Sequence, residues 1–383
     1  MSKKLLVKKY TRKPTLLFYT NVDWSFVSHR LDLAKEAILD GYEVHLSSNI
    51  TNSKDIIEKN GIFLHESYLS RRFHLFRDFY AIIKLILLIF KIKPKIIHNV
   101  SNKNIIIGGV VARIFKIKKI ILAVSGLGYI YINKNLFTYI IKKIINLAYT
   151  IILKYKNSFV IVQNESDYNF ISNIIKDDKK LNRIILIPGS GVDTDHFKPV
   201  EKSGNKIVVS IVARMLYDKG VNEFVQAAKI LNKKYDKVEF NLYGEPDHGN
   251  PKSIPLIELN KWNLFKNINW KGHVKDSLSI YNNSDIIVLP SYREGMPKAI
   301  LEASSCGKPS IVTNVPGCRD SIIPNKTGLL VKLYDIDDLV KKIEILITND
   351  ELRKSMGIEA RKLALMKFNI KKINLQQLKI YRK

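Results

Sequence analysis

Residues 290–309 read PSYREGMPKAILEASSCGKP, and this segment indicates the fold more clearly than any other. The apolar run Asp285–Pro290 before it and Ser310–Thr313 after it predict two buried strands. Between them, Pro297 suits the first turn of a helix, because its missing N–H costs nothing there. The segment therefore predicts a strand, a loop, a helix over Lys298–Cys306 and another strand, the repeating unit of a parallel α/β sheet.

Two glutamates lie in this segment, Glu294 in the loop and Glu302 about one turn into the helix. The free N–H groups and positive dipole end of a helix N-terminus attract phosphate. Carboxylates accept hydrogen bonds from sugar and ribose hydroxyls. The arrangement predicts a nucleotide-sugar site. The alternative, two solvated surface carboxylates, is disfavoured by the agreement of the turn and strand signals.

Two cations follow an earlier predicted strand, Lys206–Ala213. Arg214 and Lys219 would lie at the carboxyl edge of the sheet, where ligands bind in such folds. Fixed cations there can stabilise the negative charge that develops on a departing diphosphate. A solvated basic loop is the alternative, and the neighbouring glutamate segment makes it the weaker one.

Strand and helix patterns alternate along the whole chain. A break at Pro188–Asp193 divides them, so we expect two Rossmann-like domains, residues 1–188 and 189–369, followed by a basic helical stretch over 370–383. Helices are expected over Leu31–Asp40 and Val221–Lys233. The other expected strands are Thr15–Thr20, Tyr42–Ser47, Ile96–Asn99, Ile120–Val124, Phe159–Val162, Arg183–Ile187, Val238–Tyr243, Ile268–Trp270 and Gly328–Val331.

The composition is that of a globular protein: 46% of the 383 residues are hydrophobic and 26% are charged. This length suits two domains. The two cysteines, Cys306 and Cys318, form neither a disulfide framework nor a metal site, so we expect reduced thiols in the cytosol. No long apolar segment follows the basic residues 1–10, so we expect no signal peptide.

The net charge of +28 is concentrated in a stretch, Phe79–Asn164, that contains no acidic residue. Arg71–Lys95 and Asn135–Lys156 are both amphipathic and cationic, as interfacial helices on anionic lipid are. Core-facing helices with lysine on the wet side would have the same composition, and both interpretations remain open. Ala81–Phe90 is too short to cross a bilayer.

The spacing of Glu294 and Glu302, with a glycine after the first and Gly-Lys-Pro after the second, resembles the E-x7-E signature of retaining glycosyltransferases of family 4. This family has the GT-B fold, in which two Rossmann-like domains face a cleft. The resemblance also implies that the helix over 370–383 packs back on the first domain. The resemblance covers nearly the whole chain and is greatest to the subgroup that builds capsules and polyprenyl-linked glycans. Its main stretches are VSGLGYIYI (124–132), NESDYNF (164–170), ARMLYDKGVNEF (213–224) and LPSYREGMPKAILEASSCGKP (289–309).

The resemblance assigns roles on the donor side. Arg214 and Lys219 would hold the donor phosphates, Glu294 the sugar hydroxyls and Glu302 the ribose. The remaining donor contacts would come from the backbone of Gly295, Met296, Pro297 and Lys298, and from His273 and Val274 beside the uracil.

The acceptor would bind to the first domain. His29 and Arg30 are candidates for the acceptor diphosphate, although the glycine-pair turn of many family members is absent before them. His98, at a strand end, would lie near the reacting sugar, or is a structural histidine. Further acceptor candidates are Lys103, Asn164 and Glu165.

The resemblance implies a metal-independent, retaining transferase with no cofactor. The donor would be a UDP-N-acetylhexosamine or related UDP-sugar, and the acceptor an undecaprenyl-diphosphate-linked sugar in O-antigen or capsule synthesis. Asp193 and Asp195 would belong to an ordinary interdomain turn and not to a metal site. The enzyme would be peripheral on the cytoplasmic face of an anionic membrane.

Two other classes remain as alternatives. The net charge also suits a nucleic-acid-binding protein, but the sequence has no recognisable binding motif, and we expect no nucleic-acid partner. A catalytically inactive scaffold of the same fold is the other alternative, and the intact glutamates and cations disfavour it.

Overall fold

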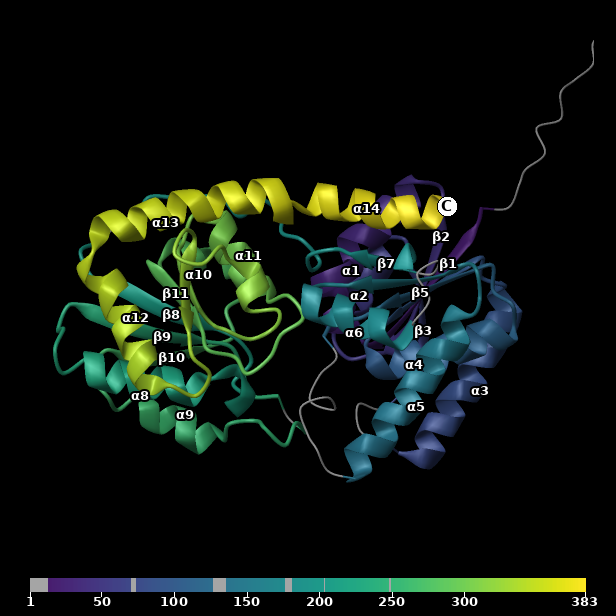
Figure 1. Cartoon of the computed structure of the whole chain (residues 1–383), viewed down its shortest axis with the longest axis horizontal. Coiled ribbons are helices and arrows are strands. Elements are labelled where there is room, and N and C mark those ends of the chain that lie inside the picture. The colour runs from purple at the N-terminus through teal and green to yellow at the C-terminus, as the bar shows by residue number, and fades with distance from the viewer. Residues whose placement is uncertain (1–12, 70–73, 127–135, 176–180, 203, 248) are drawn as a thin grey trace, which may run out of the picture. The chain divides into compact units, whose positions relative to one another are not determined.

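The computed structural model describes residues 13–69, 74–126, 136–175, 181–202, 204–247 and 249–383. It contains two parallel β-sheets flanked by helices (Figure 1), which confirms the predicted α/β class with two Rossmann-like sheets. The basic N-terminus, residues 127–132 of the shared stretch, and the first positions of the two cationic segments, 71–73 and 135, lie outside the described residues.

The first sheet has the strand order β3-β2-β1-β4-β5-β6-β7, which reverses between β1 and β4. Its strands are β1 (Thr15–Val22), β2 (Glu43–Asn49), β3 (Phe63–Glu66), β4 (Ile96–Val100), β5 (Lys119–Ala123), β6 (Ser158–Val162) and β7 (Ile184–Leu186). The helices are α1 (Asp23–Leu39), α2 (Lys54–Lys59), α3 (Leu75–Ile92), α4 (Asn102–Ile114), α5 (Leu136–Leu153) and α6 (Glu165–Ile175).

The second sheet has the order β10-β9-β8-β11-β12-β13, which reverses between β8 and β11. Its strands are β8 (Ile207–Val212), β9 (Val238–Tyr243), β10 (Ile268–Gly272), β11 (Ile286–Leu289), β12 (Ser310–Thr313) and β13 (Gly328–Val331). The helices are α8 (Val221–Leu231), α9 (Leu256–Trp262), α10 (Ser277–Asn282), α11 (Lys298–Ser305), α12 (Ile336–Thr348), α13 (Asp350–Leu363) and α14 (Ile370–Arg382).

Both faces of the second sheet are buried, as its continuous apolar strands require. Along β11, Ile286 and Val288 join the core with α8, α9 and α12, whereas Ile287 and Leu289 join the core with α10 and α11. The alternation follows from the two-residue period of a strand. Figure 1 shows α8 and α9 on one side of this sheet and α11 on the other.

The chain divides into two compact units. Unit 1 comprises the described residues of Met1–Ala123, Ile144–Val160 and Gln377–Lys383, and unit 2 those of Val124–Lys143 and Ile161–Gln376. The end of α14 is fixed within unit 1, because Arg382 donates to both carboxylate oxygens of Asp40 at 2.9 and 2.6 Å.

Every predicted strand is present, with ends close to the expected ones. The first helix differs: α1 begins at Asp23, directly after β1, and not at Leu31. The Asp23 carboxylate accepts hydrogen bonds from the backbone N–H groups of Thr51 (2.7 Å) and Ser53 (3.0 Å). Burial acts to raise the pKa of Asp23, but hydrogen bonds from the Thr51 hydroxyl and from the N–H groups of Thr51, Ser53 and Trp24 outweigh it and lower that pKa. A charged carboxylate thus begins the helix.

Within the described ranges, none of the helices combines the length and apolar composition needed to cross a bilayer.

Candidate functional site

The carboxyl ends of β8 and β11 lie side by side at the point where the strand order of the second sheet reverses. Ligands of open α/β sheets bind at such a reversal. Lys219 follows β8 and Glu294 follows β11, and the Lys219 Nζ lies 2.5 Å from the Glu294 Oε1. Their side chains are 17% and 15% exposed, so this ion pair is partly open to solvent. The structure therefore brings together two of the predicted donor residues.

Backbone contacts hold the loops of Lys219 and Glu294 against each other. The Tyr292 N–H donates to the Asp218 carbonyl at 2.9 Å, and the Tyr292 hydroxyl donates to Glu223 at 2.6 Å. Gly220 has φ +70°, and a Cβ there would lie 2.1 Å from the Pro290 carbonyl oxygen. Only glycine permits this approach.

Arg214, the second predicted phosphate ligand, forms an ion pair with Asp247. Its side chain is 44% exposed, which makes it more accessible than Lys219. A guanidinium at this edge of the sheet can bind phosphate oxygens in a bidentate manner.

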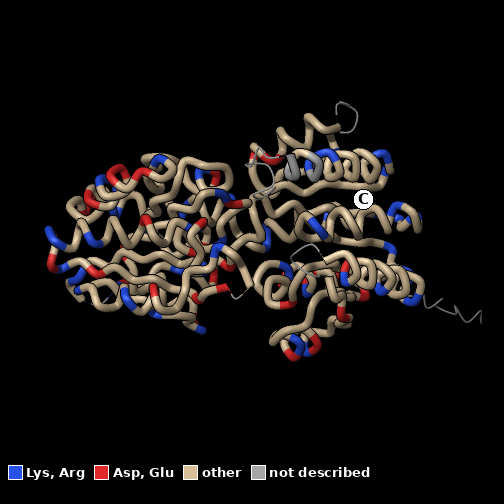
Figure 2. The backbone as a smooth tube through the Cα atoms, turned by 90° about the horizontal axis from the view of Figure 1, so that it is seen from below, with Lys and Arg blue, Asp and Glu red and all other residues tan. Residues whose placement is uncertain are grey.

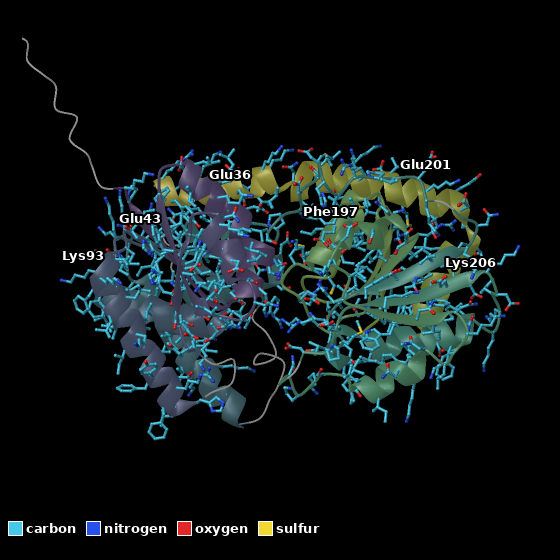
Figure 3. All side chains as sticks on the ribbon, turned by 180° about the vertical axis from the view of Figure 1, so that it is seen from behind. Glu36, Glu43, Lys93, Phe197, Glu201 and Lys206 are labelled. Carbon is cyan, nitrogen blue, oxygen red and sulfur yellow. The ribbon has the colours of Figure 1, made fainter. Side chains whose placement is uncertain are left out.

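Glu302 lies on the first turns of α11 and is largely buried. Its Oε2 accepts a hydrogen bond from the Tyr281 hydroxyl at 2.7 Å, and its Oε1 is 3.5 Å from the Lys298 Nζ. Burial, followed by the Glu302 charge, raises the pKa of Tyr281 well above its ordinary value. Phe197, labelled in Figure 3, packs edge-on against Tyr281 at 5.9 Å and fixes its ring.

His273 and Val274 follow β10, two strands away from β8. His273 is exposed and Val274 is half-buried. Gly272 before them has φ +64°, a turn conformation that favours glycine.

The predicted acceptor residues Asn164 and Glu165 lie where β6 passes into α6, within unit 2. Asn164 is buried and its Nδ2 donates to the Gly295 carbonyl at 2.9 Å. The structure thus places Asn164 against the loop that carries Glu294, whereas Glu165 is exposed.

The remaining acceptor candidates lie in unit 1. His29 is exposed on α1, and the neighbouring Arg30 is buried, which lowers the pKa of its guanidinium. Both lie about two turns inside the helix and not in a turn after β1, because α1 begins early. Lys103, on α4, forms an ion pair with Asp78 at 2.6 Å.

His98 has no exposed surface. Its Nδ1 lies 2.6 Å from the Tyr381 hydroxyl, and its ring stacks on Phe18 with 5.0 Å between centroids. Burial and the nearby Arg30 lower the pKa of His98 well below its ordinary value. Lys119 donates to the Tyr381 carbonyl at 2.7 Å. These contacts favour the structural alternative for His98, as the residue that receives the end of α14.

Asp193 and Asp195 form a turn. The Asp193 Oδ1 accepts from the N–H groups of Asp195 and His196, and Asp195 pairs with Lys371 at 2.8 Å. Across the described residues, no three His, Cys, Asp or Glu side chains cluster so as to hold a metal ion.

Cys306 and Cys318 are buried free thiols, and burial raises the pKa of Cys306 to about 12.

Sequence reasoning missed three residues that support the site: Tyr281, Asp167 and Arg293. The Tyr281 hydroxyl donates to Glu302. Asp167 accepts hydrogen bonds from Asn164 and from Arg293, the residue before Glu294. Asp167 could have been found, because Asn-x-x-Asp at the end of a strand is typical of a helix N-cap. No sequence pattern indicates that Tyr281 reaches Glu302, because the two lie on different helices.

Two family models match the chain. The one described as Glycosyl transferase 4-like matches residues 15–164, and the one described as Glycosyl transferases group 1 matches residues 192–363. Two solved structures share the fold. Sucrose-phosphate synthase from Thermosynechococcus elongatus has a TM-score of 0.77 and 19% identity over 97% of this chain and 98% of that one. Anabaena HepE, in complex with UDP and glucose, has a TM-score of 0.77 and 16% identity over 96% of this chain and 99% of that one.

Several relatives are similar over most of their length. The N,N'-diacetylbacillosaminyl-diphospho-undecaprenol alpha-1,3-N-acetylgalactosaminyltransferase of Campylobacter jejuni is 32% identical over 70% of this chain and 72% of its own. The capsular polysaccharide biosynthesis glycosyltransferase CapM of Staphylococcus aureus is 28% identical over 85% of this chain and 86% of its own. The UDP-Gal:alpha-D-GlcNAc-diphosphoundecaprenol alpha-1,3-galactosyltransferase of Escherichia coli is 29% identical over 79% of each chain. With this similarity and the GT-B fold, the chain belongs to glycosyltransferase family 4 and is a glycosyltransferase.

Proposed function

We propose that the enzyme transfers an N-acetylhexosamine from a UDP-sugar to an undecaprenyl-diphosphate-linked glycan in the synthesis of O-antigen, capsule or a similar surface polysaccharide. The observation that carries this proposal is the Lys219–Glu294 pair at the strand-order reversal, one loop before the N-terminus of α11. A cation beside a carboxylate at that point suits a donor with a diphosphate on one side and sugar hydroxyls on the other.

The proposed reaction retains the configuration of the transferred sugar. The acceptor hydroxyl oxygen attacks the anomeric carbon on the face from which the diphosphate leaves. A donor phosphate oxygen takes the hydroxyl proton, and the bond from the anomeric carbon to the phosphate oxygen breaks with its electron pair on UDP. Lys219 and Arg214 stabilise the charge on the departing diphosphate. No protein nucleophile, metal ion or cofactor takes part.

Substrate binding divides along the predicted roles. Glu294 and the backbone of residues 295–298 contact the sugar, Glu302 the ribose, and His273 with Val274 the uracil. His29, Lys103 and Glu165 remain the exposed or partly exposed candidates for the acceptor. The lipid-linked acceptor is proposed from the two relatives whose names include diphospho-undecaprenol substrates.

The identity of the donor is tested by measuring the binding and slow hydrolysis of a panel of UDP-sugars in EDTA and without acceptor. We expect one UDP-N-acetylhexosamine to bind and to be hydrolysed slowly, with release of a sugar of the donor's anomeric configuration. An inverted product would overturn retention, and loss of binding in EDTA would overturn metal independence. If no UDP-sugar binds but a GDP-sugar does, the nucleotide is wrong. Salt-sensitive binding to duplex DNA without any nucleotide-sugar binding would favour the nucleic-acid alternative.

We also propose that the enzyme works on the cytoplasmic face of an anionic membrane, with the outer face of α3 against the lipid. Seven large hydrophobic residues on this helix are exposed, and Phe76, Phe79 and Phe90 are 89%, 63% and 59% exposed. At about 100° per residue, six of these seven form one stripe opposite the buried side of the helix, and Leu75 at the helix start lies beside it. This outer stripe of α3 consists of Phe76, Phe79, Tyr80, Ile83, Leu87 and Phe90.

Basic residues accompany the outer stripe. Lys84 and Lys91 are exposed on its flank, and the Lys84 Nζ lies 5.3 Å from the Tyr80 ring centroid. Lys93, labelled in Figure 3, is exposed just beyond the helix end. The Lys and Arg positions are blue and the acidic ones red in Figure 2. An apolar stripe flanked by cations is typical of a helix that lies in the interface of an anionic bilayer.

A paired substitution tests the outer stripe. We expect Phe76→Ser with Phe79→Ser to lower partitioning onto phosphatidylglycerol-containing vesicles at least about tenfold, because each ring loses its burial in the lipid. Vesicle sedimentation measures this. Leu264→Ser removes a single apolar side chain that is 84% exposed in unit 2 and should leave partitioning unchanged. Equal binding by the double variant and the wild type would show that another surface meets the membrane.

A further inference from the structure

The loop that carries Glu294 is held at Ser291 and Tyr292 by hydrogen bonds to Asp218, but the hydrogen bonding at Glu294 itself is weaker. The Glu294 N–H reaches the Pro316 carbonyl at 3.3 Å, which is a long hydrogen bond. The Glu294 side chain binds Lys219. The position of the carboxylate therefore depends on what holds Arg293 and Gly295 on either side of it.

Asn164 holds Gly295. Its side-chain Oδ1 accepts from the Asp167 N–H at 2.9 Å, so Asn164 caps the N-terminus of α6. Its Nδ2 is then directed at two acceptors, the Gly295 carbonyl at 2.9 Å and the Asp167 Oδ2 at 3.1 Å. The cap of one helix thus binds the backbone beside Glu294.

Asp167 holds Arg293. The Arg293 Nη2 donates to the Asp167 Oδ1 at 3.2 Å, and the Asp167 side chain is only 1% exposed. A buried carboxylate needs charged and hydrogen-bonding partners, because desolvation is costly. The Asn164 amide and the Arg293 guanidinium are such partners. One carboxylate therefore connects the α6 cap with the residue before Glu294.

The backbone of the loop is also packed closely at Gly295. A Cβ on Gly295 would lie 2.5 Å from the Gln163 Oε1 and 2.6 Å from the Ser125 carbonyl oxygen. A Cβ on Gly317 would lie 2.2 Å from the Glu294 carbonyl oxygen. The loop is thus held on both sides, and a shift of its backbone would have to break these contacts.

We propose that Asn164, Asp167 and Arg293 form a clamp that positions Glu294 toward the donor sugar. The inference rests on the proposed donor role of Glu294 and adds the residues that determine its position. Asp167 and Arg293 are positioning residues, because they act through the loop and not on the sugar itself. All three members belong to unit 2.

Asp167→Asn tests the clamp, because it keeps the shape of the side chain and removes its charge. We expect kcat for transfer to fall on the order of 10- to 100-fold, the effect of a small misplacement of a substrate contact. We also expect weaker binding of the intact UDP-sugar, whereas the affinity for UDP alone, which lacks the sugar, stays within about twofold. Titration calorimetry with both ligands measures this difference. A merely structural defect would weaken both ligands equally.

Asp285→Asn is the matched control. Asp285 is another carboxylate of unit 2 with a cationic partner, though it is less buried than Asp167, and it binds Lys202 and the Val208 N–H at the opposite end of β11. This variant should keep wild-type kinetics even if its melting temperature falls.

A double-mutant cycle separates the clamp from independent effects. Asp167→Asn combined with Arg293→Gln should reduce kcat little more than either single change, because both break the same ion pair. Arg293→Lys, which keeps the charge, should recover part of the rate. Additive losses, or equal losses for UDP and UDP-sugar, would overturn the clamp. If the wild type binds no UDP-sugar, the proposed function fails instead.

Discussion

Glu294→Ala is expected to reduce sugar transfer by about 10²–10³-fold, the loss found when a preorganised polar contact to a reacting group is removed. The carboxylate lies at the carboxyl edge of the second sheet and is paired with Lys219. Without it, the sugar loses its hydroxyl acceptor, and Lys219 loses the partner that orients its Nζ. Steady-state kinetics with the identified UDP-sugar measure the loss. The melting temperature should stay within about 4 °C of the wild type, because the side chain is partly exposed.

Glu344→Ala provides the comparison for this variant. Like Glu294, Glu344 accepts a hydrogen bond from a lysine, Lys234 at 3.2 Å, and it accepts another from Tyr235 at 2.9 Å, but it lies on α12, away from the strand-order reversal. The Glu344→Ala variant should transfer sugar at the wild-type rate. Wild-type activity in Glu294→Ala as well would show that the catalytic site lies elsewhere.

Lys219→Met should have a second large effect, and it should affect nucleotide binding as well as catalysis. The lysine supplies a positive charge beside the donor diphosphate, and this charge matters most as the phosphate bond breaks. We expect kcat/KM to fall at least about 10²-fold and UDP to bind at least about tenfold more weakly. Calorimetry with UDP and steady-state kinetics give the two numbers.

Lys202→Met is the matched control, because Lys202 is likewise a largely buried lysine paired with a carboxylate. It should bind UDP as the wild type does. If Lys219→Met kept full UDP affinity and full activity, Arg214 would have to hold the diphosphate without it. In that case, combining Lys219→Met with Arg214→Ala would remove UDP binding.

Local signals were sufficient for much of the fold. The strand before Glu294 and the helix after it were predicted almost to the residue, because the apolar runs mark the strands and Pro297 marks the first turn of the helix. The start of α1 was not predicted. Its first turn depends on Asp23 meeting N–H groups from Thr51 and Ser53, about thirty residues away in the chain. A contact of that kind has no local pattern.

The same distinction applies to the site. Lys219 and Glu294 could be chosen because both follow predicted strands, and the carboxyl ends of parallel strands share one edge. The sequence did not predict that β8 and β11 are neighbours, nor that the Lys219 Nζ reaches Glu294; both follow from the structure. His98 shows the limit of a strand-end argument: its position in the sequence suits a ligand contact, yet Tyr381 covers its ring.

The contact between His98 and Tyr381 also affects the order of folding during synthesis. Unit 1 takes most of its residues from before Val160, but it also includes Gln377–Lys383, and all of Ile161–Gln376 is translated in between. At about 5–20 residues per second, this delay lasts on the order of ten seconds or more. During that time His98 and Lys119 lack the residue that covers them. The nascent chain therefore has to keep a large, partly finished unit soluble on the ribosome, which is a task for the chaperones that bind there.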